Sequence, residues 1–436
     1  MRTMKDSGIE WIGDIPADWN IKRVKAVLCE RNESNNPIQT DEILSLTNDR
    51  GVIPYEEKGD VGNKSKEDLT GYKLAYPGDI VLNSMNVFIG SVGLSSYFGC
   101  VSPVYYMLYP RNKNDSVSFF NYLFQTKELQ TKLHGYGNGI MEIRMRIQMS
   151  KLNSVQLPVP PSDVQHKIAA FLDCKCSQID AIIARQKEVI EKLKAYKLSV
   201  ITEAVTKGLN PDVPMKDSGI PWVGNICNHY ALSRVGAFCF VTKLAGFEYT
   251  DIMSSAISDT GEVPIVRAQN VRMFNFNDNI DEYIGLDVSQ KLYRCALNKK
   301  CLLITFIGAG IGDVCVFSKT MRYHLAPNVA KIEIRDEYKT ILDEEYLMFY
   351  LGSLAGKGEI SKISKASAQP SLSMGTIRGI TIAVPPIDEQ RKISEYLSRK
   401  IAFIDKVVRG KESIIENLLA YKNSLIYEIV TGKKEV

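Results

Sequence analysis

Three glycines at positions 308, 310 and 312 give the stretch FIGAGIGDV (Phe306–Val314) some likeness to a cofactor-binding loop. Glycine-rich turns that follow a strand cradle phosphates or S-adenosylmethionine. The spacing does not fit GxGxxG, however, and no Gly-Lys-Ser/Thr follows. The chain also has no Asn-Pro-Pro or Asp-Pro-Pro motif of the kind that amino-methyltransferases share. We interpret the stretch as a strand turn and keep an S-adenosylmethionine-dependent DNA methyltransferase as an alternative function.

The other residue types that carry catalysis are scattered. The four histidines, at positions 134, 166, 229 and 324, form no HxxxH motif, and no GxSxG is present. None of the nine cysteines belongs to a CxxC pair, which favours free thiols in a reducing compartment. We therefore predict a cytoplasmic chain with no catalytic residue and no metal site.

Polar side chains able to pair with DNA bases are the stronger signal. Arg, Gln, Asn and Ser can bond base edges in a groove, and they gather in GYGNGIMEIRMRIQ (135–148) and KASAQPSLS (365–373). Residues 111–151 hold seven Lys/Arg against three Asp/Glu, a local charge of +4 that suits a phosphate-facing patch. A merely solvated loop remains the alternative. The candidate DNA contacts are Arg144, Arg146, Gln148, Asn83, Ser84, Asn86, Arg267, Gln269, Asn270, Thr305, Gln369 and Ser371.

The elements that must position these residues are written twice in the chain of 436 residues. MKDSGIEWIGDIPADW from Met4 and MKDSGIPWVGNICNHY from Met215 share nine of sixteen residues, at an offset of 211. Residues 160–208 align without gaps on 385–433, at an offset of 225 with 21 identities in 49. The chain is therefore a tandem duplication whose second variable region is 14 residues longer.

Each second repeat predicts a long helix. A proline pair precedes it, Asp163 is the predicted N-cap, and the pattern continues to about Val205. Apolar residues recur every seven positions, with a polar member at the same heptad in both copies, which predicts that the two helices pair through a coiled-coil seam. The alternative is that each helix packs only on its own domain. The seam is Leu172, Ile179, Gln186, Leu193, Val200, Leu397, Ile404, Lys411, Leu418 and Leu425.

The variable regions mix strand-like and helical runs. ILSLT, DIVLN and SPVYYMLY read as strands in the first, and VPIVRAQNV, CLLITFIG, DVCVF and VAKIEI in the second. FFNYLFQTKELQTKL and EEYLMFYLGSLAG read as helices. The predicted fold is α+β, with two mixed α/β domains and two long helices. The expected parts are domain 1 with its opening phrase (1–159), a central helix (160–208), domain 2 with the second phrase (209–384) and a distal helix (385–436).

The order of these parts carries a family signature. GxxWxGxIPxxW, a YPGDI strand start (Tyr76–Ile80), then PPSDVQHKIAAFL and a long helix, repeated with PPIDEQRKISEYL, resembles the specificity subunit of type I restriction-modification systems over essentially the whole chain. One departure stands out, because Cys227 and Tyr230 replace Pro16 and Trp19 of the first phrase. Docking or packing of the second phrase is therefore expected to be less regular.

The resemblance implies a non-catalytic DNA-recognition subunit that serves defence against foreign DNA. Each variable region would be a target recognition domain reading one half of a bipartite double-stranded target, related by a pseudo-two-fold through an antiparallel coiled coil. The helices would dock two methyltransferase (modification) subunits, and restriction (helicase-nuclease) subunits would join them. S-adenosylmethionine, ATP and Mg would then bind the partners, with no cofactor in this chain and no membrane contact. A coiled-coil scaffold that binds only protein is a further alternative.

Overall fold

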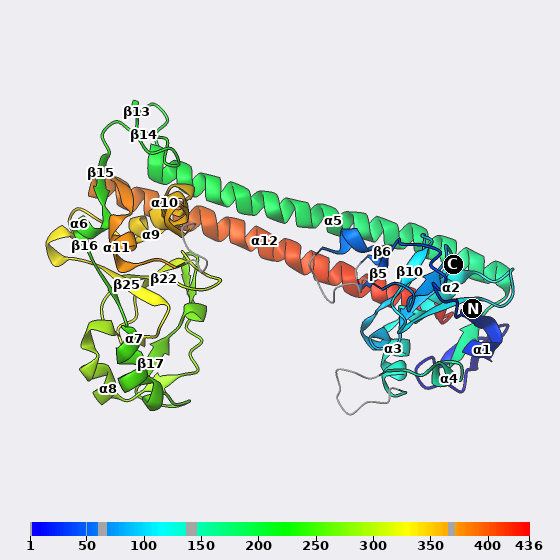
Figure 1. Ribbon diagram of the computed structural model, residues 1–436. Helices are drawn as coiled ribbons and strands as arrows, with labels where there is room; N and C mark the ends of the chain where they lie inside the picture. Colours follow the sequence, from blue (N-terminus) through cyan, green and yellow to red (C-terminus); the bar gives the residue numbers. More distant parts are fainter. Residues whose placement is uncertain (1, 49, 60–67, 137–145, 365–370) are drawn as a thin grey trace. The chain divides into compact units, whose positions relative to one another are not determined.

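The computed structural model describes residues 2–48, 50–59, 68–136, 146–364 and 371–436 (Figure 1). The chain divides into two compact units. Unit 1 comprises residues 1–187 and 412–436, and unit 2 comprises residues 188–411. Two long helices, α5 (Ser162–Lys207) and α12 (Ile387–Val430), each contribute one segment to both units. Among the described residues, no helix combines the length and apolarity that a bilayer crossing requires.

Unit 1 is built on an antiparallel four-stranded sheet in the order β4-β11-β8-β9. Its strands are β4 (Leu28–Arg31), β11 (Tyr105–Pro110), β8 (Ile80–Asn83) and β9 (Val92–Leu94). The smaller strand pairs are β1 (Met4–Asp6) with β2 (Asp14–Pro16), β3 (Asn20–Arg23) with β12 (Gln156–Val159), β5 (Leu44–Thr47) with β6 (Gly51–Pro54), and β7 (Lys73–Ala75) with β10 (Gly99–Val101). The short helices are α1 (Val24–Val27), α2 (Val117–Phe124), α3 (Lys127–His134) and α4 (Met149–Leu152).

Unit 2 repeats this plan with an added sheet. Its antiparallel sheet β16-β25-β22-β23 consists of Cys239–Lys243, Val329–Ile334, Cys301–Thr305 and Val314–Phe317. The added sheet β20-β17-β24-β21 consists of Tyr283–Ile284, Val263–Val266, Tyr323–Leu325 and Ala296–Leu297. The pairs β13 (Met215–Asp217) with β14 (Asn225–Cys227), β15 (Ala231–Arg234) with β26 (Thr381–Val384), and β18 (Val271–Arg272) with β19 (Asn275–Phe276) complete the strands. The helices are α6 (Val235–Phe238), α7 (Gly246–Glu248), α8 (Leu286–Lys291), α9 (Glu344–Gly352), α10 (Leu354–Ser364) and α11 (Met374–Gly379).

The predicted strands are confirmed except in VPIVRAQNV, where the strand β17 ends at Val266 and a 3-10 turn, Ala268–Asn270, separates it from β18. Both predicted domain helices are interrupted. FFNYLFQTKELQTKL forms α2 and α3, with a break at Thr126. The Thr126 hydroxyl donates to the Leu123 carbonyl at 2.7 Å, and the Gln130 amide donates to the Phe124 carbonyl at 3.1 Å. In unit 2 the break falls at Ser353, whose hydroxyl donates to the Tyr350 carbonyl at 2.6 Å. These side chains satisfy the carbonyls that a helix end leaves open.

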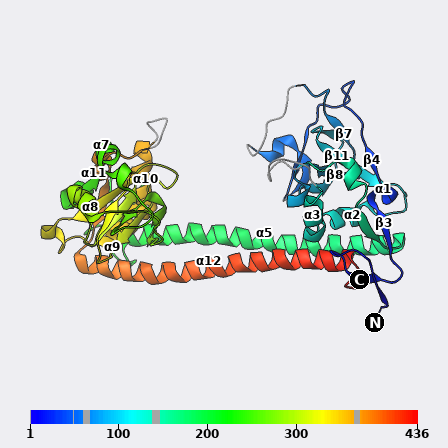
Figure 2. The same ribbon diagram turned by 90° about the horizontal axis from the view of Figure 1, so that it is seen from below.

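The two long helices run antiparallel within each unit. In unit 1 the red end of α12 lies beside the start of α5 (Figure 1 and Figure 2), and Lys422 Nζ contacts Asp180 Oδ2 at 2.7 Å. In unit 2 the end of α5 meets the start of α12, and Lys197 Nζ contacts Asp405 Oδ1 at 2.7 Å. Asp180 and Asp405, like Lys197 and Lys422, are 225 positions apart. Each unit therefore holds the pseudo-symmetric counterpart of the other unit's ion pair.

The seam residues face inward along both helices. Leu172, Ile179, Leu397, Ile404 and Leu425 are buried. Gln186, Leu193, Val200, Lys411 and Leu418 are half-buried. The alternative interpretation is also partly right, because Leu172 belongs to the core of unit 1 and Leu397 to that of unit 2. The outer turns of each helix thus pack on a globular domain as well as on the other helix.

A buried glutamine ties the start of each long helix to its domain. Gln165, 1% exposed, accepts from Ser116 N at 3.0 Å and donates to Pro160 O at 3.0 Å and Asp115 Oδ1 at 3.2 Å. Gln390, 0% exposed, accepts from Asp343 N at 3.0 Å and donates to Ile341 O at 2.7 Å and Pro385 O at 2.8 Å. The repeated Gln of the PPSDVQ and PPIDEQ segments therefore makes a three-bond clamp in each copy. Two of the bonds are equivalent, whereas the third goes to the Asp115 side chain in unit 1 and to a backbone carbonyl, Ile341 O, in unit 2.

The departure in the second phrase is compensated, so the expected irregular packing is wrong. Tyr230 is 1% exposed, as is Trp19 at the equivalent position. The Tyr230 hydroxyl donates to Glu389 Oε1 at 2.7 Å, where the first copy has Val164. The Cys227 thiol donates to Lys207 O at 2.9 Å. A buried phenol requires a hydrogen-bond partner, and the second copy supplies one.

Candidate nucleic-acid interface

Several candidate contacts of unit 1 meet at the end of β8. We call the residues Asn83–Asn86 and Arg146–Gln148 the β8 surface. The two segments are joined where Ile147 N donates to Ser84 O at 2.9 Å, and the Tyr106 hydroxyl holds Ile147 O at 3.0 Å. Residues at least 60 positions apart in the sequence are thereby brought into one surface, with buried Ile147 as its anchor.

The side chains of the β8 surface divide into two groups. Arg146 and Gln148 are exposed and Asn86 is half-exposed, so these three are available to a ligand. Asn83 and Ser84 are buried: Asn83 Oδ1 accepts from Met85 N at 3.0 Å, and the Ser84 hydroxyl donates to Val104 O at 2.6 Å. Their burial keeps both side chains from a DNA base.

Unit 2 builds an equivalent surface at the end of β22. We call the residues Thr305–Gly308 and Ser371–Ser373 the β22 surface. Leu372 N donates to Phe306 O at 2.9 Å, as Ile147 N does to Ser84 O. Ile147 and Leu372 are 225 positions apart, and both are buried. Ser371 and Ser373 are exposed, whereas Thr305 is 0% exposed and its hydroxyl has no hydrogen-bond partner among the described residues.

The glycine-rich stretch is the hairpin connection of this surface. Thr305 N donates to Asp313 O at 2.9 Å, as Asn83 N does to Ser91 O at 3.1 Å, and Gly312 (φ 87°) matches Gly90 (φ 91°). The stretch joins two antiparallel strands, β22 and β23. A dinucleotide or phosphate loop instead joins a strand to a helix N-terminus. The geometry therefore favours the strand turn over the cofactor loop.

Three further candidates of unit 2 lie in the loop after β17. Gln269 is exposed, and Arg267 forms an ion pair with Glu282. Asn270 is 1% exposed; its Oδ1 accepts from Arg267 N at 2.8 Å and its Nδ2 donates to Asn277 O and Asn279 O at 3.0 and 2.9 Å. The Asn270 amide is thus fully used within the loop. Arg144 and Gln369 lie outside the described residues.

Cations that the sequence does not single out surround the hairpin of unit 2. Lys243 Nζ lies 4.9 Å from the centroid of the Phe306 ring. Half-buried Asp313 has a raised pKa because burial disfavours the carboxylate, although the charges of Lys357 and Arg272 act in the opposite direction. Lys243, Arg272 and Lys357 come from β16, β18 and α10. Only the folded chain places them together, so no local pattern identifies them.

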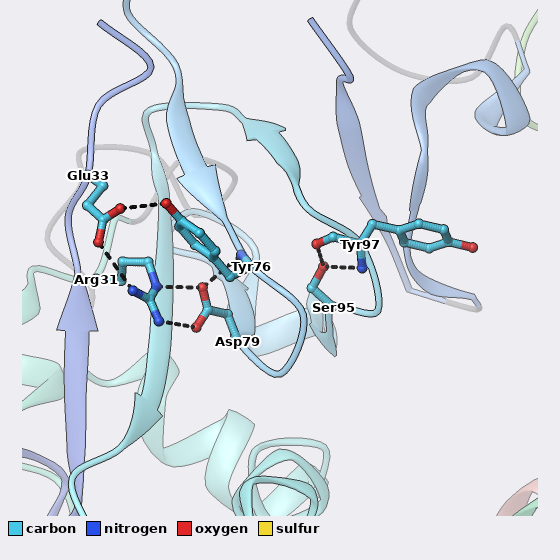
Figure 3. Close-up of polar contacts among 6 residues, drawn as sticks. All are labelled: Arg31, Glu33, Tyr76, Asp79, Ser95 and Tyr97. Atoms are coloured by element: carbon cyan, nitrogen blue, oxygen red, sulfur yellow. Dashed lines mark hydrogen bonds and ion pairs between the residues drawn. The ribbon is translucent and has the colours of Figure 1, made fainter. Parts of the chain in front are cut away.

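The YPGDI motif has a structural role in unit 1 (Figure 3). Gly78, with φ 88°, occupies the turn position that glycine tolerates, and buried Asp79 accepts from Tyr76 N at 3.0 Å. Arg31 Nε donates to Asp79 Oδ2 at 2.9 Å, and its guanidinium lies 4.5 Å from the Tyr76 ring centroid and 4.8 Å from that of Tyr109. This cluster fixes the start of β8 and so the strand that ends in the β8 surface.

The same close-up shows how the neighbouring turn is held. Glu33 bridges the Arg31 guanidinium, at 3.2 Å, and the Tyr76 hydroxyl, at 2.9 Å. The Ser95 hydroxyl accepts from Tyr97 N at 3.2 Å and leaves the Tyr97 ring 40% exposed (Figure 3).

One acidic group among the described residues has the spacing of a metal site. Oxygens of Asp343, Glu344 and Glu345 lie within 4.8 Å of one another. Asp343 already caps α9 by accepting from Tyr346 N at 2.9 Å, and Lys300 Nζ contacts Glu345 at 2.7 Å and Glu344 at 3.6 Å. A helix cap and a lysine account for these carboxylates.

Two equivalent surfaces of different chemistry on one duplicated helical frame define a two-part recognition protein. Comparison with known families identifies it further, because the family model for the type I restriction modification DNA specificity domain matches residues 16–193 and again 247–417. The chain belongs to this family, and its α+β fold with two such domains and long paired helices is the predicted one. Each match includes the β8 or the β22 surface.

Relatives with assigned names agree with this family. The EcoBI specificity subunit of Escherichia coli is 24% identical over 64% of this chain, but the match spans only 57% of that relative's length. The MjaVIII specificity subunit of Methanocaldococcus jannaschii is 21% identical over 97% of this chain and 94% of the relative. Both are named type I restriction enzyme specificity subunits.

Solved structures support the fold. A chain from a study of complex assembly and conformational transition of the type I R-M system matches 96% of this chain and 99% of its own length, with a TM-score of 0.72 at 12% identity. The HsdS subunit of Thermoanaerobacter tengcongensis matches 96% of this chain and 98% of its own length, with a TM-score of 0.50 at 13% identity.

Proposed function

We propose that this chain is the non-catalytic DNA-recognition subunit of a type I restriction-modification complex. Its β8 surface reads one half of a bipartite double-stranded target, and its β22 surface reads the other half. The observation that carries the proposal is the repeated backbone bond, Ile147 N to Ser84 O and Leu372 N to Phe306 O, which presents different side chains at equivalent places. A common frame with divergent contacts suits two unlike half-sites.

The chemistry of the two surfaces supports different base preferences. Arg146 and Gln148 are long donors of the kind that pair bidentately with guanine and adenine edges. Ser371 and Ser373 are short, and Gly308 adds no side chain, so the β22 surface allows close approach of its backbone to the duplex. Lys243, Arg272 and Lys357 supply positive charge for phosphates around that surface.

Methyl transfer and cleavage are assigned to partners. The frame offers two equivalent sets of features, the phrase at Met4 and Met215 and the helix starts at Gln165 and Gln390, which suit two copies of a methyltransferase subunit. S-adenosylmethionine binds that subunit, while ATP and Mg bind the restriction (helicase-nuclease) subunits of the complete assembly.

An exchange of readers tests the proposal. Residues 20–150 are replaced by the matching region of a related subunit, and methylated adenines are mapped by long-read sequencing in a host that supplies the methyltransferase. One half-site is expected to change while the other is retained. A change in both halves, or methyl transfer by the purified chain with S-adenosylmethionine alone, contradicts the assignment.

A protein-only scaffold is the second candidate. A scaffold explains the duplicated frame, but it gives no reason for the exposed Arg146 and Gln148 on a hydrogen-bonded surface. A gel shift with duplex DNA, with and without the methyltransferase subunit, separates the two, because a scaffold gives no sequence-dependent shift in either case.

A further inference from the structure

A second heptad stripe runs along the part of α12 that belongs to unit 2. Lys392, Tyr396, Arg399, Phe403 and Lys406 follow one another in steps of four, three, four and three residues. We call these five residues the α12 stripe. Tyr396 is 41% exposed and Phe403 65% exposed, so two aromatic rings on one helix face lack cover. Side chains that recur at heptad spacing form a continuous line on one face of a helix, which a neighbouring helix can contact.

The stripe is separate from the seam that pairs the two long helices. The seam residues Leu397 and Ile404 are 0% and 2% exposed. Leu397 belongs to the core of unit 2, as does Ile401, which is 8% exposed. The stripe borders a surface groove of about 400 Å³ lined by Lys392, Glu395, Tyr396, Arg399, Lys400 and Phe403. The same helix therefore has one line of buried apolar residues and a second line with exposed aromatic residues.

The charge around the stripe is strongly positive. Residues 391–409 contain six Lys/Arg and two Asp/Glu, a net charge of +4. Both acids are engaged, since Glu395 pairs with Arg399 and Asp405 with Lys197. Among the described residues, no carboxylate lies within ion-pair distance of Lys392 or Lys406. An acidic occupant would gain ion pairs here that the chain does not make by itself.

The first copy lacks both features. The residues 225 positions earlier are Lys167, Phe171, Cys174, Gln178 and Ala181, and residues 166–184 contain two Lys and two Asp, a net charge of 0 excluding histidine. Phe171 is partly buried against the core of unit 1. A partner that binds the shared frame in two equivalent copies needs the same surface twice, and the α12 stripe exists only once.

We propose that the α12 stripe docks one amphipathic, acidic helix of a protein partner, in a single copy per chain and in addition to whatever the shared frame binds. Apolar side chains of that helix cover Tyr396 and Phe403, and its carboxylates pair with Lys392, Arg399 and Lys406. The 15 residues from Lys392 to Lys406 span ~21 Å at a rise of ~1.5 Å per residue, so the docked helix has about four turns.

Protein is favoured over DNA as the occupant because of the aromatic rings. A phosphate backbone would pair with the lysines but would leave the 65% exposed Phe403 in water. An apolar ring on a helix at heptad spacing is instead the usual anchor for another helix.

The first measurement uses a probe peptide. The full chain is titrated with a fluorescent 21-residue helix carrying Leu at heptad spacing and Glu elsewhere, and with a control in which Lys replaces each Glu. One acidic peptide is expected to bind per chain, at least tenfold more weakly to the double variant Phe403→Ala/Arg399→Glu. The matched variant on the first copy, Gln178→Ala/Cys174→Glu, is expected to bind like the wild type.

The second measurement uses the complex purified from its native host. Native mass spectrometry is expected to show that the complex formed with the α12 double variant contains one partner protein fewer than the wild-type complex. The complex formed with the first-copy variant is expected to keep all its subunits. An unchanged composition overturns the proposal whatever the peptide does, and so does a stoichiometry of two peptides. A lowered affinity for duplex DNA with a smaller salt slope would assign the stripe to phosphate contacts instead. Half-site methylation tests the proposed function separately.

Discussion

The glutamine clamps make a prediction whose size follows from the structure. Replacing Gln390 by Met keeps the volume of the side chain and removes three hydrogen bonds, to Asp343 N, Ile341 O and Pro385 O. Gln390 is 0% exposed, so water does not replace these bonds without rearrangement. A buried polar group left without its partner costs about 1–3 kcal/mol. Three such groups that relax together are expected to lower the free energy of unfolding of unit 2 by about 3–5 kcal/mol.

The assay is hydrogen exchange in increasing urea, with peptides from each unit followed separately. Gln390→Met is expected to lower the opening free energy of unit 2 alone, and Gln165→Met that of unit 1 alone. Gln269→Met is the control, because exposed Gln269 in unit 2 makes no such clamp and a surface change is usually worth less than about 0.5 kcal/mol. A loss below about 1 kcal/mol for both clamp variants would refute the reasoning.

Three further predictions concern contacts, register and pH. If Arg146 contacts a base, Arg146→Ala weakens DNA binding by about 1–3 kcal/mol and relaxes only the half-site read by unit 1. If it contacts a phosphate, the variant lowers the affinity for all DNA sequences. Methylome mapping and a salt titration of DNA binding distinguish the two, with Arg185→Ala as the unaffected control. The partly exposed pair Lys197–Asp405 is worth about 0.5–1 kcal/mol, so Lys197→Asp alone destabilises unit 2 and the swap with Asp405→Lys recovers most of the loss in urea unfolding; no recovery would mean that the pair is not coupled. Burial lowers the pKa of His324 in the folded state, so as the pH falls the imidazole is protonated at a higher pH in the unfolded state than in the folded state. The contribution of His324 to the stability of unit 2 is therefore complete above about pH 6.5 and declines below it. His324→Asn is expected to flatten that decline, and an equal decline in both proteins would place its source elsewhere.

Much of the frame follows from local sequence. Heptad spacing over five heptads predicts the long helices because apolar residues that recur every 3.5 positions on average form one continuous seam on a helix. The offset of 225 between Pro160 and Pro385 predicts two equivalent helix starts, and Gln165 and Gln390 each accept from the backbone N–H group at the start of a domain helix. The strand runs are similarly local, since alternation and β-branched residues mark DIVLN and VAKIEI without knowledge of their neighbours.

The helix breaks and the roles of polar residues do not follow from residue type alone. The break at Thr126 is held by its hydroxyl and by the Gln130 amide, which bond two carbonyls near the end of α2. Asn270 has the residue type of a base reader, but the fold uses its whole amide inside a loop. Composition alone does not distinguish an amide that is free from one that is bonded.

By itself, the sequence determined that this protein is duplicated, that two long helices pair along heptad seams, and that the parts between them have diverged. Only the tertiary structure decided that Ser84 and Phe306 are equivalent, because their offset of 222 matches neither repeat and the equivalence appears in the bonds to Ile147 and Leu372. It also decided which cations surround the β22 hairpin, since Lys243, Arg272 and Lys357 come from three separate elements. Periodicity is a property of neighbouring residues, whereas a recognition surface is made by hydrogen bonds between segments far apart in the chain.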